Sequence, residues 1–222
     1  MTIEVSLYPE SFEIMGVNVG LSVVIAWGVL AVLLLALVFI RIRIRKFTEG
    51  EPKGLQNALE MLVDGISKFA QGKVGRHAGF MAPVALTLMC YVALTTFVEI
   101  FGLPPATEDI NCTLALGLCA FLAVNAAGFY AKGFGGRMKS LATPTAVVFP
   151  IRVLTDCIAP FSMAIRLFAN VMVGGVIMQL IYKVVPILVP SFLASYFNVL
   201  HVGIQTFVFG LLLLTYAGEA VE

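Results

Sequence analysis

One arginine stands inside a long apolar stretch of the sequence, and it is the residue best placed to do chemistry. Residues 153–185 carry only three formal charges, Asp156, Arg166 and Lys183. A guanidinium keeps its proton up to a pKa of about 12, so Arg166 cannot enter lipid as a neutral group. We therefore expect Arg166 to face protein, water or an anion, and to be the centre of function.

Polar and small residues recur at four-residue intervals around this arginine. On a helix, Ser162, Arg166, Asn170 and Gly174 would form one stripe. Gln205 is the most deeply placed polar side chain of the next apolar segment, and its amide would be able to hydrogen-bond the guanidinium or a water. The alternative for Gln205 is a simple tie between two helices, which is a common use of polar residues in membranes.

Arg166 also has an alternative without a functional role, in which it is a structural cation paired with Asp156 or with a lipid phosphate. Asp156 would lie about 15 Å away along a helix and on a different face. Both ends of the apolar segment are far from Arg166, which makes snorkelling awkward. We infer that another polypeptide supplies the anion, whose carboxylate the guanidinium would hold in its ionised form by lowering its pKa.

Other polar positions give weaker signals. Glu99, Glu108, Asp109 and Asn111 cluster between two apolar segments, where they would line either an aqueous entrance or a solvated loop. The four cysteines lie in or beside apolar segments without a Cys-x-x-Cys or Cys/His cluster, so we expect neither a metal site nor a bound cofactor. The net charge of +1 gives no sign of nucleic-acid binding.

Composition places these residues in a membrane protein. The 222 residues are 60% hydrophobic and 12% charged, against about 25% charged in soluble domains. We predict an all-α single membrane domain over residues 1–222. Apolar runs predict five spanning helices, at residues 17–40, 80–101, 112–130, 153–185 and 191–217.

The last two predicted spans differ from the others in length. At about 1.5 Å per residue, 153–185 would be about 50 Å long, whereas the hydrocarbon core is about 30 Å thick. Pro186 and Pro190 predict a tight reversal between the two spans. The two spans are thus expected to form a long tilted hairpin.

Residues 52–73 have apolar positions at spacings of three and four and polar residues between them. This pattern predicts an amphipathic helix lying in the membrane interface. A helix packed against a soluble partner has the same pattern, so this alternative stays open.

Positive charge sets the expected orientation. All but two of the 14 lysines and arginines lie between the first and second spans or between the third and fourth. The positive-inside rule therefore places the N-terminus outside and the C-terminus in the cytoplasm. The N-terminal residues are acidic and do not resemble a signal peptide, so we expect the first span to be retained.

Three stretches, at residues 105–116, 160–170 and 205–209, resemble subunit a of the F-type ATP synthase. The most specific is the pattern Ser-x-x-x-Arg-Leu-Phe-x-Asn, which runs from Ser162 to Asn170. The resemblance implies a non-catalytic stator subunit of a bacterial plasma membrane, assembled with the c-subunit ring, the peripheral-stalk b subunits and the rest of the synthase. Arg166 would face the c-ring carboxylate, with Asn170 and Gln205 as companions, and two half-channels would couple H⁺ or Na⁺ flow to rotation.

The sequence departs from the family pattern where relatives carry titratable groups. Gly175 stands where an acid or a histidine is common, and Asn198 where His or Glu is common. Water around Gly175, with His201, Glu99 or Asp109 nearby, is a possible replacement for the missing groups. The resemblance therefore adds Ser162, Gly175, Asn198, His201, Glu99, Asp109 and Asn111 as possible channel-lining residues.

Two other classes of protein stay open from the residues alone. A self-contained secondary transporter or channel would need its own counter-anion and substrate cavity. A pure scaffold subunit would need neither.

Overall fold

The structure is a computed structural model, and it describes residues 11–14, 17–44, 54–101, 105–142, 149–184 and 188–221. Apart from one short β-hairpin, these residues are mainly helical. The α-helices are α1 (Leu21–Ile44), α2 (Leu55–Val74), α3 (Ala78–Phe97), α4 (Ile110–Ala142), α5 (Phe149–Val184) and α6 (Leu188–Val221). Short 3-10 turns η1 (Gly75–His77), η2 (Val98–Phe101) and η3 (Ala106–Glu108) connect them.

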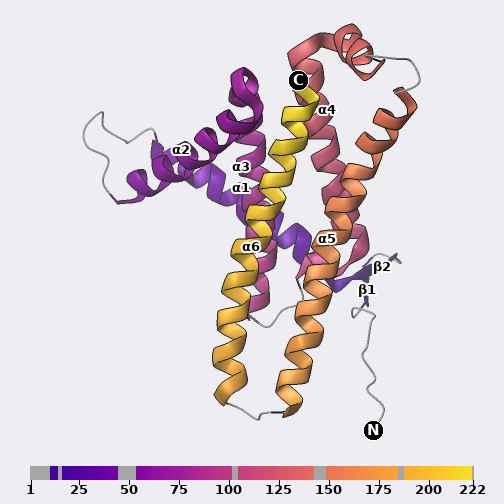
Figure 1. Cartoon of the computed structure of the whole chain (residues 1–222). Coiled ribbons are helices and arrows are strands. Elements are labelled where there is room, and N and C mark those ends of the chain that lie inside the picture. Colours follow the sequence, from indigo (N-terminus) through magenta and orange to yellow (C-terminus); the bar gives the residue numbers. More distant parts are fainter. Residues whose placement is uncertain are drawn as a thin grey trace.

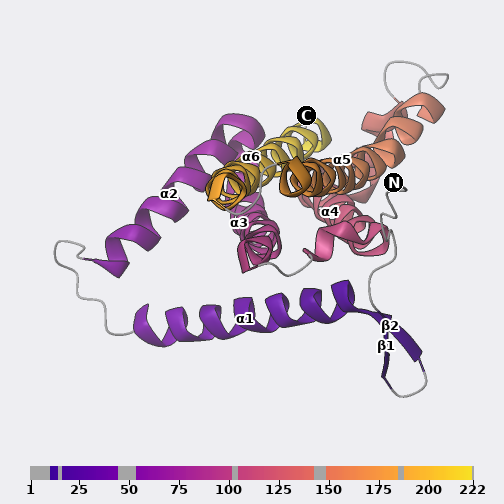
Figure 2. The same cartoon turned by 90° about the horizontal axis from the view of Figure 1, so that it is seen from below.

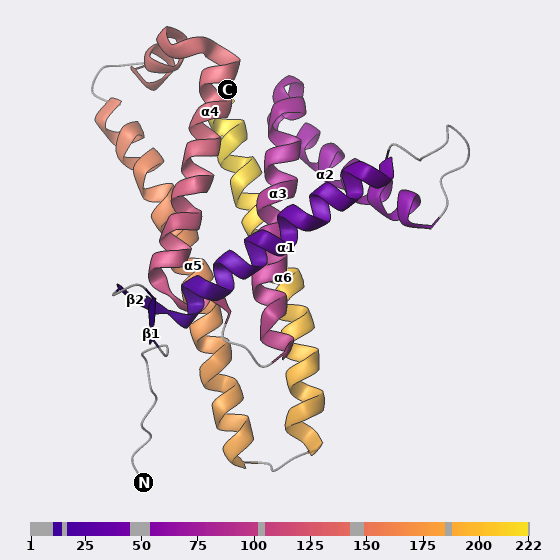
Figure 3. The same ribbon diagram turned by 180° about the vertical axis from the view of Figure 1, so that it is seen from behind.

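Helices α3 to α6 lie side by side, and α5 and α6 run antiparallel as a hairpin that extends beyond the others (Figure 1). Seen from below, α1 lies across one side of this bundle (Figure 2). The view from behind shows α1 running obliquely from the β-hairpin toward α2 (Figure 3). The α5–α6 hairpin is therefore inclined relative to α1, and its tilt in a membrane remains a prediction.

The β-hairpin corrects the all-α prediction at its N-terminal end. Strands β1 (Ser11–Ile14) and β2 (Val17–Gly20) pair antiparallel, with Phe12 opposite Val19. The first helix begins at Leu21, four residues later than predicted. Alternating apolar residues and β-branched valines favour a strand here, and an apolar run cannot separate a strand from a helix start by hydropathy alone.

Four of the described helical stretches are long and apolar enough to cross a membrane: Leu21–Arg43, Gln56–Phe97, Ile110–Gly133 and Val199–Val221. Within α5, the stretch Phe161–Val176 is apolar but shorter. The count of five spans therefore remains a prediction. So does the single domain over 1–222, because several segments of that range lie outside the described residues.

The hairpin helices are longer than predicted. α5 has 36 residues and α6 has 34, so each is about 50 Å long or slightly more. Pro190 does not take part in the reversal, because it lies in the first turn of α6, where a proline has no helical hydrogen bond to lose. Pro186 lies outside the described residues.

A helix forms at the predicted amphipathic segment and turns into α3 at Gly75, whose φ of 63° suits a glycine. Ala70 and Val74 of α2 are buried against the bundle, while Met61 and Leu62 are exposed. The position of α2 in the membrane interface stays a prediction.

Alanine is the most frequent residue of the core, which allows the helix backbones to approach closely. At Gly218 of α6, an added Cβ would meet the main-chain oxygen of Lys73 in α2, and at Gly210 it would meet the Met89 side chain of α3. Buried alanines contribute from four helices: Ala70, Ala78, Ala82, Ala85, Ala120, Ala127, Ala217 and Ala220.

Candidate functional site at the hairpin of α5 and α6

Arg166 lies on α5 at the edge between a buried and an exposed face. Met163 and Leu167, on either side of it, are each 2% exposed, while Arg166 itself is exposed. Ile165 and Val173 are also exposed, so the guanidinium emerges into apolar surface. No acid whose side chain the structure describes pairs with Arg166, and the side chain of Asp156 lies outside the described part of the chain.

Asn170 and Gln205 join the two helices next to this arginine. The Asn170 Nδ2 group donates a hydrogen bond of 2.8 Å to Oε1 of Gln205. Gln205 is 4% exposed, whereas Asn170 is exposed. Among the described residues, the Gln205 oxygen is thus used by the Asn170 amide rather than by the guanidinium, and the bond fixes how α5 and α6 face each other here.

Two small cavities lie along α6, between the level of Arg166 and the C-terminal end of that helix. One, of about 10 Å³, is lined by Arg166 and Gln205, and the other, of about 20 Å³, by Asn125, Tyr216 and Glu219. Met163 lines both. A cavity needs about 10–15 Å³ to hold a water, so the second has room for one and the first is at the limit.

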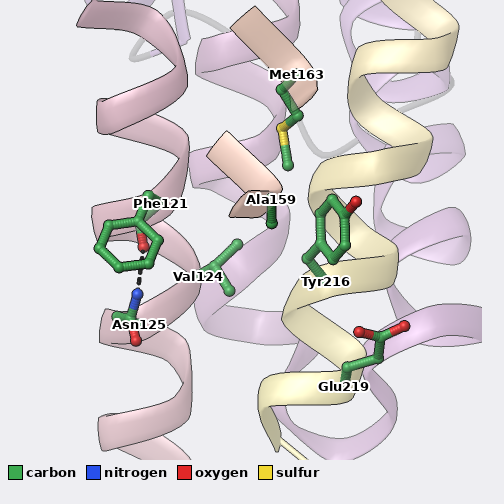
Figure 4. Close-up of a pocket in the computed structure, with 7 residues that line it drawn as sticks. All are labelled: Phe121, Val124, Asn125, Ala159, Met163, Tyr216 and Glu219. Atoms are coloured by element: carbon green, nitrogen blue, oxygen red, sulfur yellow. Dashed lines mark hydrogen bonds between the residues drawn. The ribbon is translucent and has the colours of Figure 1, made fainter. Parts of the chain in front are cut away.

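Figure 4 shows the larger of these two cavities between α4, α5 and α6, with Glu219 at one end and Met163 at the other. The Asn125 amide donates to the Phe121 main-chain oxygen of its own helix, at 3.0 Å. Its carbonyl oxygen remains as a possible acceptor. That Tyr216 and Glu219 share a cavity with Asn125 could not be predicted from the sequence, because the three residues come from distant segments.

Toward the other end of the hairpin, His201 of α6 packs against Gly174 of α5. A Cβ at Gly174 would lie 3.6 Å from Nδ1 of His201, so the glycine leaves room for the imidazole. Nε2 of His201 is buried and has no hydrogen-bond partner in the described part of the chain. Gly175 has open space where its side chain would begin, and water at this position stays a prediction.

The candidates Glu99, Asp109 and Asn111 lie away from the hairpin, where η2, η3 and the start of α4 meet. Asp109 accepts hydrogen bonds from the main-chain N–H and the side-chain amide of Asn111, at 2.9 and 3.1 Å. Asp109 therefore caps α4. The hydroxyls of Ser22 and Thr107 and one oxygen of Glu99 are buried and unpaired among the described residues.

Two carboxyl groups at this junction have raised pKa values. Glu99 lies past Phe97, where the apolar span ends, and burial raises its pKa, with a further rise from the nearby charge of Glu108. Partial burial also raises the pKa of Glu108, although much of this side chain is exposed. Both groups therefore hold a proton more readily than a solvated glutamate.

The structure brings together Arg166, Asn170 and Gln205, with Gly174 and His201 on the same helix pair. Ser162 is half-buried one turn before Arg166 and lines neither small cavity. The side chain of Asn198 lies outside the described residues. The described part of the chain holds no cluster of three or more His, Cys, Asp or Glu side chains suited to a metal ion.

Comparison of the sequence with known proteins places the chain in a family. The sequence model of the ATP synthase A chain matches residues 23–218. "ATP synthase subunit a" of Mycobacterium marinum is 28% identical over 94% of this chain and 90% of its own length. The protein of that name from Moorella thermoacetica is 28% identical over 96% of both chains.

A third relative, "ATP synthase subunit a" of Acidothermus cellulolyticus, is 32% identical over 75% of this chain and 65% of its own length. The matched region of the family model contains Arg166, Asn170 and Gln205. Together with the four apolar helices, these matches identify a multi-pass membrane protein. The chain belongs to the ATP synthase A chain family.

Proposed function

We propose that the chain is the ion-translocating stator subunit of a rotary F-type ATP synthase. In this role, Arg166 faces the ion-binding carboxylate of each c subunit that passes the stator. Membership of the family supports the assignment to the complex. The proposed role of Arg166 is supported by the residues that surround it in the structure.

The observation that carries this proposal is an exposed guanidinium on an apolar surface. Phe161 and Ile165 of α5 and Ile204 and Phe207 of α6 are each more than half exposed, so the hairpin offers apolar area on which another membrane helix would pack. A cation at such a surface needs an anion, and no described acid provides one. A carboxylate on a moving partner fits both features.

The bond between Asn170 and Gln205 supports a positioning role for these two residues. Both amide groups lie next to Arg166 and add no charge. Within the described residues 161–176 and 199–217, the guanidinium is therefore the only group with a formal charge. A partner carboxylate that arrives there would be held in its ionised form. It would be released when rotation carries it away.

Two access paths would bring ions to and from this carboxylate. On the outer side, His201 with an unpaired Nε2 and the open space at Gly175 offer a polar route where family members carry other titratable groups. On the inner side, the small cavity at Asn125, Tyr216 and Glu219 leads toward Met163 and Arg166. An ion would enter by one path and leave by the other after nearly a full turn of the ring.

The arginine between the two paths would prevent a direct leak. A membrane potential contributes about 2.3 kcal/mol per charge for each 100 mV, which drives rotation in one direction. ATP chemistry would reside on other subunits, with the c ring and the peripheral-stalk b subunits as neighbours in the membrane. Whether H⁺ or Na⁺ is carried would depend mainly on the c subunit.

Replacement of the cation tests the proposal. Arg166→Ala in the complete synthase, assayed in inverted membrane vesicles, is expected to abolish ATP-driven ion uptake and to allow passive leakage. The c ring and b subunits should still co-purify, because an exposed side chain contributes little to packing. Arg76→Ala, at an exposed arginine of η1, is the matched control and should pump normally. Normal coupled transport by Arg166→Ala would refute the role.

The rival is a self-contained transporter. It would need an internal counter-anion for Arg166, which the described residues do not provide. Purified chain in liposomes should accordingly show no gated, substrate-saturable transport. If it did, the stator assignment would fail.

A further inference from the structure

A cavity of about 490 Å³ lies between α1, α2 and α3, apart from the hairpin of α5 and α6. Its walls are mainly aliphatic, and none of the described side chains of α5 or α6 lines it. The wall residues that matter here are Ala36, Leu37 and Ile40 of α1, Leu59 and Val63 of α2, and Leu86 of α3.

The size of this cavity indicates what kind of molecule fits. Pockets that hold one small organic molecule measure about 300–1,000 Å³. In a membrane, an apolar space of this size has room for a lipid acyl chain, and the charges beside it identify the headgroup.

The polar part of the lining lies on one side and is acidic. Gln56, Glu60 and Asp64 recur every four residues along α2, so they form one stripe at the cavity. The Gln56 amide donates to Oε1 of Glu60 at 2.9 Å. Neither carboxylate forms an ion pair within the described residues.

Positive charge lies at the end of α1 that borders the same cavity. Ile40 lines the cavity, and Arg41 and Arg43 follow in the last turn of the helix, both exposed. The Arg43 guanidinium stands 5.7 Å above the Phe39 ring. A headgroup at this position would therefore have carboxylates on the α2 side and guanidinium groups on the α1 side.

We infer that this cavity binds one zwitterionic aminophospholipid, of the phosphatidylethanolamine class. An acyl chain fills the apolar space, the primary ammonium donates hydrogen bonds to Glu60 and Asp64, and the phosphate faces Arg41. Phosphatidylglycerol has no ammonium for the carboxylates. Phosphatidylcholine has a cation without N–H donors. The site should thus favour phosphatidylethanolamine over both.

Native mass spectrometry of the delipidated full-length chain tests this order. The chain is expected to retain one phosphatidylethanolamine at least about tenfold more tightly than phosphatidylglycerol of the same acyl composition, with phosphatidylcholine between them. Equal retention of the three lipids would overturn the inference. So would co-purification of a polypeptide that protects Cys90, which lines the cavity, from alkylation when no lipid is added.

Two sets of variants separate the chain pocket from the headgroup contacts. Ala36→Trp fills the cavity and should weaken binding about tenfold or more. Leu35→Trp is the matched control, since Leu35 is 70% exposed and outside the lining, and should bind normally. Glu60→Gln with Asp64→Asn changes only exposed side chains, so folding is preserved and the preference over phosphatidylglycerol should be lost. An unchanged preference in that double variant would contradict the inference.

Discussion

At the scale of the residue, one side-chain hydrogen bond links α5, which carries the arginine, to α6. The Gln205 oxygen that accepts from Asn170 belongs to a buried side chain, so loss of its donor leaves a polar group without water or partner. Such a loss is larger than the net value of the bond itself. The effect of removing Asn170 therefore depends on whether Gln205 is still present.

A double-mutant cycle on this pair should show coupling. Asn170→Ala and Gln205→Ala are each expected to destabilise the folded chain, and the double variant should lose less than the sum, with a coupling of about 0.6 kcal/mol and at most about 1.7 kcal/mol. Denaturant unfolding in bicelles measures it. Asn111→Ala combined with Gln205→Ala is the control, because Asn111 bonds only to Asp109 in the described residues and the two effects should add.

Gly218 is a second residue for which the direction of the stability change on replacement can be predicted. An alanine there would meet the Lys73 main-chain oxygen, which cannot rotate away, so α2 and α6 would have to separate. We expect Gly218→Ala to destabilise the fold by about 1–3 kcal/mol. Gly65→Ala on α2 meets nothing within 4 Å and should stabilise by about 0.5–1 kcal/mol, as measured by thermal unfolding. Equal effects of the two changes would show that the close approach is unimportant.

At the scale of the element, the start of α4 depends on Asp109. Its side chain accepts the N–H of Asn111, and the Thr113 N–H bonds to its main-chain oxygen at 3.1 Å. The sequence placed Asp109 among possible channel-lining residues, whereas its contacts are those of a helix cap. Both roles need an oxygen, but only ion transfer needs a group that titrates.

Two substitutions distinguish these roles. Asp109→Ala should destabilise the chain by about 0.5–2 kcal/mol, because the cap is lost. Asp109→Asn keeps the oxygen and should preserve both stability and ATP-driven ion uptake. If Asp109→Asn folds normally and yet stops uptake, Asp109 takes part in transfer and its capping role is secondary.

The helical elements could be predicted from apolar runs, and their ends could not. The predicted span 80–101 agrees well with α3, because long apolar runs have few alternatives, whereas α4 runs to Ala142, twelve residues beyond the predicted span 112–130. The β-hairpin at Ser11–Gly20 and the helical position of Pro190 escaped prediction, since both depend on local backbone pairing rather than hydropathy. Likewise, four-residue spacing predicted the Arg166 and Asn170 stripe, but only the fold brings Tyr216 to Asn125.

At the scale of the whole molecule, the helix order fixes which ends share a side of the membrane. Glu108 precedes α4, Glu219 lies at the end of α6, and both side chains are exposed. If the charge distribution sets the orientation as expected, Glu108 faces outward and Glu219 faces the cytoplasm.

Sided labelling tests this orientation. In a background without the four native cysteines, Glu108→Cys should react with a membrane-impermeant maleimide in intact cells, and Glu219→Cys only in inverted vesicles. Permeabilised cells, where both should react, provide the control. The reverse pattern would invert the topology and exchange the two access paths.

The way α1 is attached has a consequence for how the protein is made. The buried residues of α1 form one narrow stripe: Ser22, Ala26, Val29 and Leu33. Apart from strand β2, the elements that α1 packs against all follow it in the sequence, namely α3, α4 and η3. During synthesis, α1 therefore leaves the ribosome before any of those surfaces exist. It must persist as a lone helix among lipids, which explains why apolar side chains cover its remaining circumference as well as the stripe.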